Sequence, residues 1–381
     1  MLGKTPPMGW NSWNTFGPNI NEKLIFEIAD AMVDLGYKDA GYEYLVIDDC
    51  WQMKTRDEKG NLVPDPEKFP HGMKYVADYV HSKGLKFGIY SAAGILTCAG
   101  YPGSFGYEFQ DAKMFADWGV DYLKYDKCHF GGAQDPKNAF LTMSVALRAT
   151  GRDIMYSGCI VGENEPHDWM RSIGAHLYRS TTDICDSPES FRSIFTSQYD
   201  KFHASAPGCF NDIDMLIVGM HGKGNVACPG GCSDDAYKMH FVLWCLWGAP
   251  LMIGSDIRNL DDNMRELLQN RELIRINQDP ECRPPYCDER QRYHATHARL
   301  ACLKLMEKGE MVLGLFNYND EQNLMVLAYF SDLGIPAGKG YGLRLTDIFT
   351  GESFVAYDYY IPRLDPMTCR VYKAEIVSRE G

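Results

Sequence analysis

The sequence has no long hydrophobic run and no excess of positive charge. Nowhere in its 381 residues do apolar side chains approach the roughly 18 in succession that a membrane-spanning helix requires. The formal net charge is −13 at pH 7, so the surface is not built to neutralise phosphates. We therefore expect neither a membrane nor a nucleic acid among the partners of this protein.

The sequence also shows neither the pattern of a signal peptide nor that of a disulfide framework. The first residues, MLGKTPPMGW, contain no apolar core of the kind that a signal peptide needs. The 13 cysteines are odd in number and are spread through segments that otherwise resemble core. Both features favour a reducing compartment, so we expect a cytoplasmic protein, or a secreted one if a leader has been removed from this chain.

Common motifs for cofactors and nucleophiles are missing too. No strand-like run is followed by G-x-G-x-x-G, and residues 103–106 read G-S-F-G, which is not the G-x-S-x-G of serine hydrolases. The 10 histidines show no ligand spacing, and Cys228 and Cys232 with Cys282 and Cys287 do not follow a standard zinc spacing. We therefore expect no metal, no nucleotide and no other cofactor.

Over residues 8–279 the chain alternates strand-like and helix-like segments, as βα units do. Within residues 21–35 the apolar side chains recur at helical spacing, and Gly36 is well placed to end a helix. The run 44–47 is nearly all apolar and stops at Asp48. Such a run is typical of a parallel strand that is covered on both faces.

Eight such runs predict an α/β fold of the (β/α)8 TIM barrel type. They lie near residues 8–13, 43–49, 86–92, 121–127, 154–158, 176–183, 209–215 and 250–256. A doubly wound sheet is the alternative, but the glycine-rich turn that marks its nucleotide site is absent. In a barrel the catalytic groups lie at the carboxyl ends of the strands, which tells us where to look for chemistry.

A second domain follows the barrel. The segment 280–285, P-E-C-R-P-P, denies helix and sheet their backbone donors and predicts a boundary. Beyond it come short strand-like runs separated by turn residues, at 303–306, 311–316, 324–327 and 369–372. We therefore predict a catalytic (β/α)8 barrel over residues 1–283 and a C-terminal antiparallel β-sandwich over 284–381.

The clearest chemical signal lies in the fourth run, residues 122–128. Because alternate residues of a strand share a face, Lys124, Asp126 and Cys128 should point into the barrel together. One interpretation is a buried ion pair that fills the barrel. The other is a carboxylate whose pKa the ammonium keeps low, so that it remains an anion suited to nucleophilic attack.

Other strand ends also carry acidic groups. They are Asp48, Asp49, Asp183, Asp212 and Asp214, and Arg179 lies on the same strand-like run as Asp183. Carboxylates gathered at one mouth suit either metal-assisted hydrolysis or a two-carboxylate attack on a glycosidic bond. A nearby lysine would repel a divalent metal, whereas aromatic side chains at strand ends favour a sugar. These aromatic residues are Trp10, Trp13, Trp51 and Tyr90.

Seven motifs in order strengthen this interpretation. They are Met8–Trp13, Ile47–Trp51, Cys98–Ser104, Ala116–Asp121, Lys124–Cys128, Asn211–Met215 and Ile276–Asp279. Together they resemble glycoside hydrolase family 27 of clan D, which comprises α-galactosidases and α-N-acetylgalactosaminidases. The resemblance spans the barrel and continues more loosely through the sandwich. It implies a retaining exo-glycosidase that releases terminal α-linked galactose by double displacement.

The resemblance also implies a role for individual residues. Asp126 would be the nucleophile and Asp183 the acid/base, with the pKa of Asp183 raised by partial burial and by the neighbouring anion. In animal relatives Cys98 and Cys128 form a disulfide under the sugar, but Cys50 lacks its expected partner here, which fits a partly or wholly reduced enzyme. The substrate-binding set would be Trp13, Asp48, Asp49, Tyr90, Cys98, Lys124, Cys128, Ile160, Arg179, Asp214 and Met215.

One departure from the family pattern leaves the 2-position of the sugar open. Ile160 stands where the family usually has a polar residue, and it cannot bond a hydroxyl. It could face an acetyl methyl, as an α-N-acetylgalactosaminidase would require, or Glu163 could swing in and restore a polar contact. A catalytically silent sugar-binding barrel is a further alternative. A homo-oligomer is compatible with the sequence, which does not predict the aglycone or the linkage.

Overall fold

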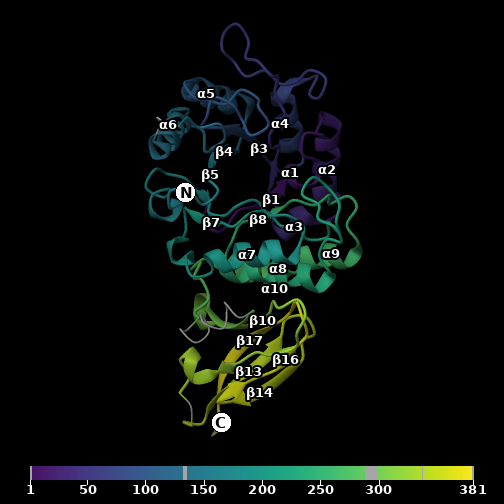
Figure 1. Ribbon diagram of the computed structural model, residues 1–381, viewed down its shortest axis with the longest axis vertical. Helices are drawn as coiled ribbons and strands as arrows, with labels where there is room; N and C mark the ends of the chain where they lie inside the picture. The colour runs from purple at the N-terminus through teal and green to yellow at the C-terminus, as the bar shows by residue number, and fades with distance from the viewer. Residues whose placement is uncertain (1, 132–134, 288–297, 337, 380–381) are drawn as a thin grey trace.

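The computed structural model describes residues 2–131, 135–287, 298–336 and 338–379 of the chain. Over these residues a parallel barrel wrapped by helices lies beside an antiparallel β-sheet unit (Figure 1). The barrel is formed by the purple to green part of the chain and the antiparallel unit by the yellow-green part. None of the helices described is both long enough and apolar enough to span a bilayer.

Eight parallel strands form the barrel sheet, in the order β7-β6-β5-β4-β3-β2-β1-β8. Their bounds are β1 Met8–Asn11, β2 Tyr44–Val46, β3 Lys86–Ala92, β4 Tyr122–Asp126, β5 Met155–Cys159, β6 Leu177–Arg179, β7 Phe210–Asp212 and β8 Leu251–Ile253. Just after β7, Leu216 forms a parallel bridge with Ile253, and this bridge closes the sheet. The predicted barrel fold is confirmed.

Several strands end earlier than their apolar runs suggest. The run 176–183 contributes only residues 177–179 to the sheet, and the run 43–49 contributes only 44–46. The residues that follow leave the pleat, so Asp48 and Asp183 lie at the mouth and not within the ladder. Shortening at the carboxyl ends is therefore what brings the acidic side chains to one edge of the barrel.

The barrel helices have the amphipathic character that the sequence predicts. Asn21 caps α2 by accepting a hydrogen bond from the Leu24 N–H at 2.9 Å, and Gly36 follows the helix with φ 84°. The predicted helix at 21–35 is thus confirmed. The bounds are α1 Trp13–Phe16, α2 Glu22–Asp34, α3 Tyr37–Ala40, α4 Gly72–Ser82, α5 Glu108–Trp118, α6 Pro136–Ala149, α7 Pro188–Gln198, α8 Asp234–Trp247, α9 Asp262–Leu268 and α10 Arg271–Asn277.

The C-terminal unit is built on a five-stranded antiparallel sheet in the order β14-β13-β17-β10-β9, with two small ladders, β11·β16 and β12·β15. The bounds are β9 Arg299–Leu305, β10 Met311–Asn317, β11 Leu324–Met325, β12 Ala328–Tyr329, β13 Tyr341–Asp347, β14 Ser353–Tyr357, β15 Tyr359–Tyr360, β16 Arg363–Leu364 and β17 Thr368–Ser378. One face of the sheet encloses a small core of its own, which includes Leu313 and Leu345. The position of the domain boundary at residue 283 stays a prediction.

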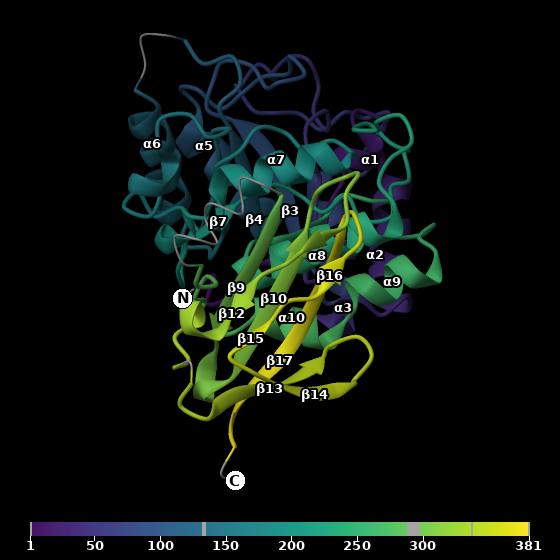
Figure 2. The ribbon, with the colours of Figure 1, turned by 60° about the horizontal axis from the view of Figure 1, so that its bottom comes forward.

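The other face of this sheet packs on the barrel. β10 and β17 lie over α8 and α10 (Figure 2), and Val312, Phe316 and Val371 belong to the same continuous apolar core as the barrel helices. Gly314 lies at the closest approach, where a Cβ atom would come within 2.7 Å of Leu246 Cδ2 on α8. A glycine is needed here so that the sheet can lie flush against the helix.

We expect Gly314→Ala to destabilise the protein by about 1–3 kcal/mol, since a methyl group at this position overpacks the contact between sheet and helix. Urea unfolding measures the effect. Gly131→Ala is the control, because a Cβ atom there meets nothing within 4 Å. Equal stability of the two variants would contradict the close packing described here.

Candidate active site

A pocket of about 460 Å³ opens at the carboxyl ends of the barrel strands. It is lined by Trp13, Asn14, Asp48, Asp49, Tyr90, Cys98, Lys124, Asp126, Cys159, Arg179, Asp183, Asp214, Met215 and Val226. Most of the residues predicted for the site therefore line one pocket. Asn14, Cys159 and Val226 were not predicted, because their types carry no chemical signal in the sequence.

Asp126 ends β4 with both carboxylate oxygens occupied. The Tyr90 hydroxyl donates to Oδ2 at 3.0 Å, and the Lys127 N–H donates to Oδ1 at 2.7 Å. Burial raises the pKa of Asp126, while Lys124 and these two donors oppose the rise. The expectation that the ammonium holds this pKa low is therefore wrong in its net direction, because desolvation of the carboxylate outweighs the nearby positive charge.

Lys124 pairs with Asp48 and not with its sequence neighbour Asp126. Its Nζ donates to Asp48 Oδ2 at 2.8 Å, and Asn11 Nδ2 donates to the same oxygen at 2.8 Å. Burial alone would lower the pKa of Lys124, but the Asp48 carboxylate raises it well above its usual value. The lysine is thus a fixed cation at the floor of the pocket.

Asp49 and the Cys98–Cys128 disulfide form another wall. The Asp49 carboxylate accepts hydrogen bonds from the backbone N–H of Cys50 at 2.7 Å and of Ala99 at 2.9 Å. Burial raises the pKa of Asp49, and these donors oppose the rise. The structure joins Cys98 and Cys128, whose Cα atoms are 4.9 Å apart, and leaves the buried Cys50 unpaired. That the enzyme is partly or wholly reduced stays a prediction.

Arg179 links two carboxylates on the opposite wall. Its Nη2 donates to Asp183 Oδ1 at 2.9 Å and forms a short ion pair with Asp214 Oδ2. Asp214 also accepts the N–H groups of Ile184 and Met215, each at 2.7 Å, and has φ 83°, an uncommon value for a residue with a side chain. Burial raises the pKa of Asp214 to about 6, although Arg179 lowers it.

Asp183 differs from expectation in one respect. Its side chain is 76% exposed, so the partial burial that was expected to raise its pKa is not present. The carboxylate stands at the rim of the pocket, on the side where Arg179 contacts it. A group in this position has access to solvent and to whatever lies outside the pocket.

Ile160 is misplaced in the predicted binding set. Its side chain is fully buried in the apolar core and does not line the pocket. The preceding residue, Cys159, points inward instead, because neighbouring strand residues face opposite sides. Glu163 is held by an ion pair with Lys127. The acetyl-facing wall proposed for Ile160 is therefore absent.

Two of the four predicted aromatic residues belong to the core. Trp10 donates from Nε1 to the Ser255 carbonyl and Trp51 to the Tyr90 carbonyl, each at 2.9 Å, and both rings are fully buried. Only Trp13 and Tyr90 reach the pocket. The number of tryptophans at strand ends was therefore a weak indicator of a sugar-binding pocket.

The four cysteines considered for zinc do not converge in the described parts of the chain. Cys282 contacts the Asp279 carbonyl, whereas Cys228 lies beside Cys185. The group of possible ligands found among the described residues is Asp126 with Cys98 and Cys128, whose sulfurs are already joined. No zinc site is formed there by the cysteines that the sequence brought into question.

Five aspartates and two cations line one pocket at the mouth of a (β/α)8 barrel, and this arrangement defines a site of the glycoside hydrolase class. The family comparison is more specific. The Melibiase_2 model, described as alpha galactosidase A, matches residues 5–279. The chain belongs to this family, which is part of glycoside hydrolase family 27.

Named relatives agree with this assignment. The chain is 50% identical to an alpha-galactosidase of Cyamopsis tetragonoloba over 279 residues, 73% of this chain and 65% of that one. It is 45% identical to an alpha-galactosidase of Coffea arabica over 337 residues, 88% of this chain and 85% of that one. Alpha-galactosidase I of Mortierella vinacea superposes with TM-score 0.88 at 31% identity, covering 98% and 97% of the two chains. The chain thus spans less than two thirds of the Cyamopsis relative.

The raised pKa of Asp214 makes a prediction about stability. The folded protein binds a proton there as the pH falls through about 6, whereas the unfolded chain does so near its ordinary 3.8. Proton binding at Asp214 therefore stabilises the folded protein. This contribution to the free energy of unfolding is fully present below about pH 4 and is lost as the pH rises through 6. Wild type should therefore lose about 1–3 kcal/mol relative to Asp214→Asn between pH 4 and 7.

Urea unfolding of both proteins across this pH range measures the difference. Glu58→Gln, at an exposed position, serves as the control and should keep a constant difference from wild type. A constant difference for Asp214→Asn as well would show that this carboxyl group has an ordinary pKa.

Proposed function

We propose that this protein is a retaining exo-glycosidase that releases terminal α-linked D-galactose from oligosaccharides or glycoconjugates. The observation that carries the proposal is that Asp126 and Asp183 line the same pocket as Lys124 and Arg179. Hydrolysis with retention needs a nucleophilic carboxylate and a second carboxyl group that first donates and then accepts a proton. Membership of the alpha galactosidase A family supports the choice of sugar.

In this proposal Asp126 attacks the anomeric carbon. Its oxygens are oriented by the Tyr90 hydroxyl and the Lys127 N–H, so the carboxylate is aimed before the substrate arrives. The glycosyl ester that forms is then cleaved by water. As negative charge leaves Asp126 in the first step, the same two donors loosen, and they strengthen again when the carboxylate is released.

Asp183 donates the proton to the departing glycosidic oxygen and later takes one from the attacking water. Its exposed position at the rim suits this role, because the aglycone of an exo-acting enzyme leaves toward solvent. Arg179 holds Asp183 Oδ1 at 2.9 Å and leaves the other carboxyl oxygen to face the substrate. Both proton transfers thus use one fixed side chain.

The remaining groups recognise the sugar. Asp48, Asp49 and Lys124 offer charged partners to the hydroxyls, and Trp13 and Met215 supply apolar surface for the ring. At the 2-position the pocket presents Arg179 and Cys159, since Ile160 has withdrawn into the core. This arrangement favours a hydroxyl over an acetamido group, and so favours galactose over N-acetylgalactosamine.

Removal of either carboxylate should abolish turnover of natural α-galactosides. We expect Asp126→Asn and Asp183→Asn to lower kcat/KM by about a thousandfold or more, while the fold is kept. Hydrolysis is followed with raffinose, and NMR reports whether α-galactose is the first product. Asp168→Asn, exposed and outside the pocket, is the matched control. Unchanged turnover in either variant, or release of β-galactose, would contradict the mechanism.

The specificity at the 2-position is tested separately. We expect wild type to hydrolyse a nitrophenyl α-galactoside at least about tenfold faster, in kcat/KM, than the corresponding α-N-acetylgalactosaminide, because Arg179 offers a hydrogen-bond donor to a hydroxyl and no apolar wall faces an acetyl methyl. Steady-state rates on the two substrates measure the ratio. A preference for the acetylated sugar would support the α-N-acetylgalactosaminidase alternative instead.

A further inference from the structure

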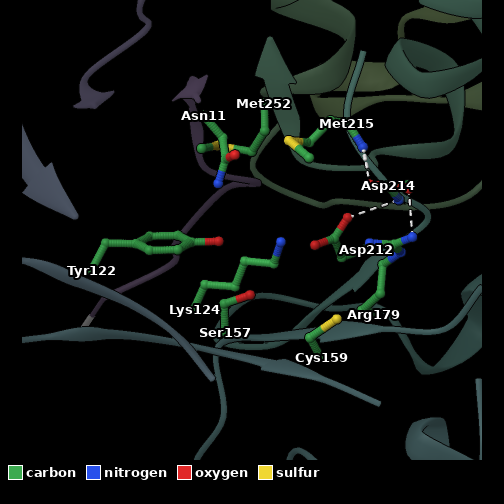
Figure 3. Close-up of a pocket in the computed structure, with 10 residues that line it drawn as sticks. All are labelled: Asn11, Tyr122, Lys124, Ser157, Cys159, Arg179, Asp212, Asp214, Met215 and Met252. Atoms are coloured by element: carbon green, nitrogen blue, oxygen red, sulfur yellow. Dashed lines mark hydrogen bonds and ion pairs between the residues drawn. The ribbon is translucent and has the colours of Figure 1, made fainter. Parts of the chain in front are cut away.

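A second cavity, of about 330 Å³, adjoins the candidate active site. Figure 3 shows the residues that line it. It is lined by Asn11, Tyr122, Lys124, Ser157, Cys159, Arg179, Asp212, Asp214, Met215 and Met252. Lys124 and Arg179 line both cavities, so these two side chains lie between this cavity and the substrate pocket. Tyr122 and Ser157 precede the pocket residues on β4 and β5, which places the cavity toward the amino ends of the strands.

Asp212, at the end of β7, is the acidic group that lines only the lower cavity. Its Oδ1 accepts the Asp214 N–H at 3.0 Å. In Figure 3 the carboxylate lies between the Lys124 ammonium and the Arg179 guanidinium, with its other oxygen toward the lysine. No direct hydrogen bond to either cation is formed, so the carboxylate acts on them across the cavity.

The surroundings of Asp212 contain few other charges. Lys124 and Tyr122 face it from β4, Cys159 from β5, Arg179 from β6 and Asp214 from its own segment. Burial raises the pKa of Asp212, and Arg179 and Lys124 lower it. In return, the Asp212 carboxylate helps to raise the pKa of Arg179. The Asp212 carboxylate therefore interacts electrostatically with the Lys124 ammonium and the Arg179 guanidinium.

The hydrogen bond to the Asp214 N–H does not by itself require a carboxylate here. The hydrogen bond from the Asp214 N–H requires only an acceptor oxygen, and an asparagine side chain offers one in the same place. A buried carboxylate carries a desolvation penalty that an amide avoids. The negative charge of Asp212 therefore acts beyond this hydrogen bond. The cations that line the same cavity, and on which it can act, are Lys124 and Arg179.

We propose that Asp212 is a positioning residue, whose charge holds the Lys124 ammonium and the Arg179 guanidinium in place beneath the sugar. The proposal rests on the proposed function, in which these two cations bind the sugar hydroxyls. Asp212 itself does not touch the substrate. The sugar hydroxyls that Lys124 and Arg179 bind do not react, and Arg179 keeps its ion pairs with Asp183 and Asp214 when Asp212 loses its charge. The loss of positioning should therefore raise KM more than it lowers kcat.

The test uses Asp212→Asn, which keeps the acceptor for Asp214 and removes only the charge. We expect KM for a nitrophenyl α-galactoside to rise about tenfold with kcat changed less than about threefold. Asp256→Asn is the matched control, since Asp256 also follows a barrel strand and pairs with an arginine but lines neither cavity. An unchanged KM in Asp212→Asn, or a loss confined to kcat, would overturn the proposal.

A second measurement separates this proposal from the proposed function. Galactose binding is measured by calorimetry in the Asp126→Asn background, where no turnover is needed. If galactose fails to bind even there, the proposed function is wrong. If it binds equally well with and without Asp212→Asn, the function stands and the positioning role is wrong. We expect the affinity to fall by the same factor by which KM rises.

A double-mutant cycle tests the route of the effect. In a Lys124→Met background we expect Asp212→Asn to weaken galactose binding by at most about threefold, because one of the two positioned cations is gone. An undiminished tenfold effect would show that Asp212 does not act through Lys124. Asp212→Ser serves as a second uncharged variant. If neither Asn nor Ser at 212 folds, the carboxylate serves the fold instead and the proposal is overturned.

Discussion

The barrel depends on the neutralisation of two buried cations by carboxylates from other strands. Lys124 of β4 pairs with Asp48, which follows β2, and Arg179 of β6 pairs with Asp214, which follows β7. Either cation alone in this interior would be strongly unfavourable. Each pair joins side chains from different strands, so it forms only when the strands of that part of the sheet have assembled. The assembly of the sheet therefore also places the charged groups of the site.

The features that follow from periodicity could be predicted from the sequence. Apolar runs alternating with amphipathic helices define the barrel, and the topology of a parallel barrel brings the acids at its strand ends to one mouth. The alternation within β4 also held. Lys124 lines the pocket, whereas Tyr125 is buried against Phe140, with ring centroids 5.3 Å apart.

Pairing between strands could not be predicted in the same way. Sequence adjacency suggests that Lys124 serves Asp126, but the lysine instead reaches Asp48, two strands away in the barrel sheet. The direction of Ile160 depends on where β5 ends, and an error of one residue turns the side chain from pocket to core. In the C-terminal unit, β13 and β14 were not predicted, because their exposed residues, including Phe354 and Val355, obscure the apolar alternation.

Helix α8 contacts both the candidate active site and the C-terminal sheet. The Trp244 indole of this helix donates to the backbone carbonyl of Asp214 at 2.8 Å, and Leu246, two residues further on, meets the C-terminal sheet at Gly314. Through α8, the C-terminal sheet thus supports the wall of the pocket that carries Arg179 and its carboxylates. Removal of the C-terminal unit would expose the apolar surface of α8 that Val312, Phe316 and Val371 cover, so this unit helps to hold the candidate active site in place.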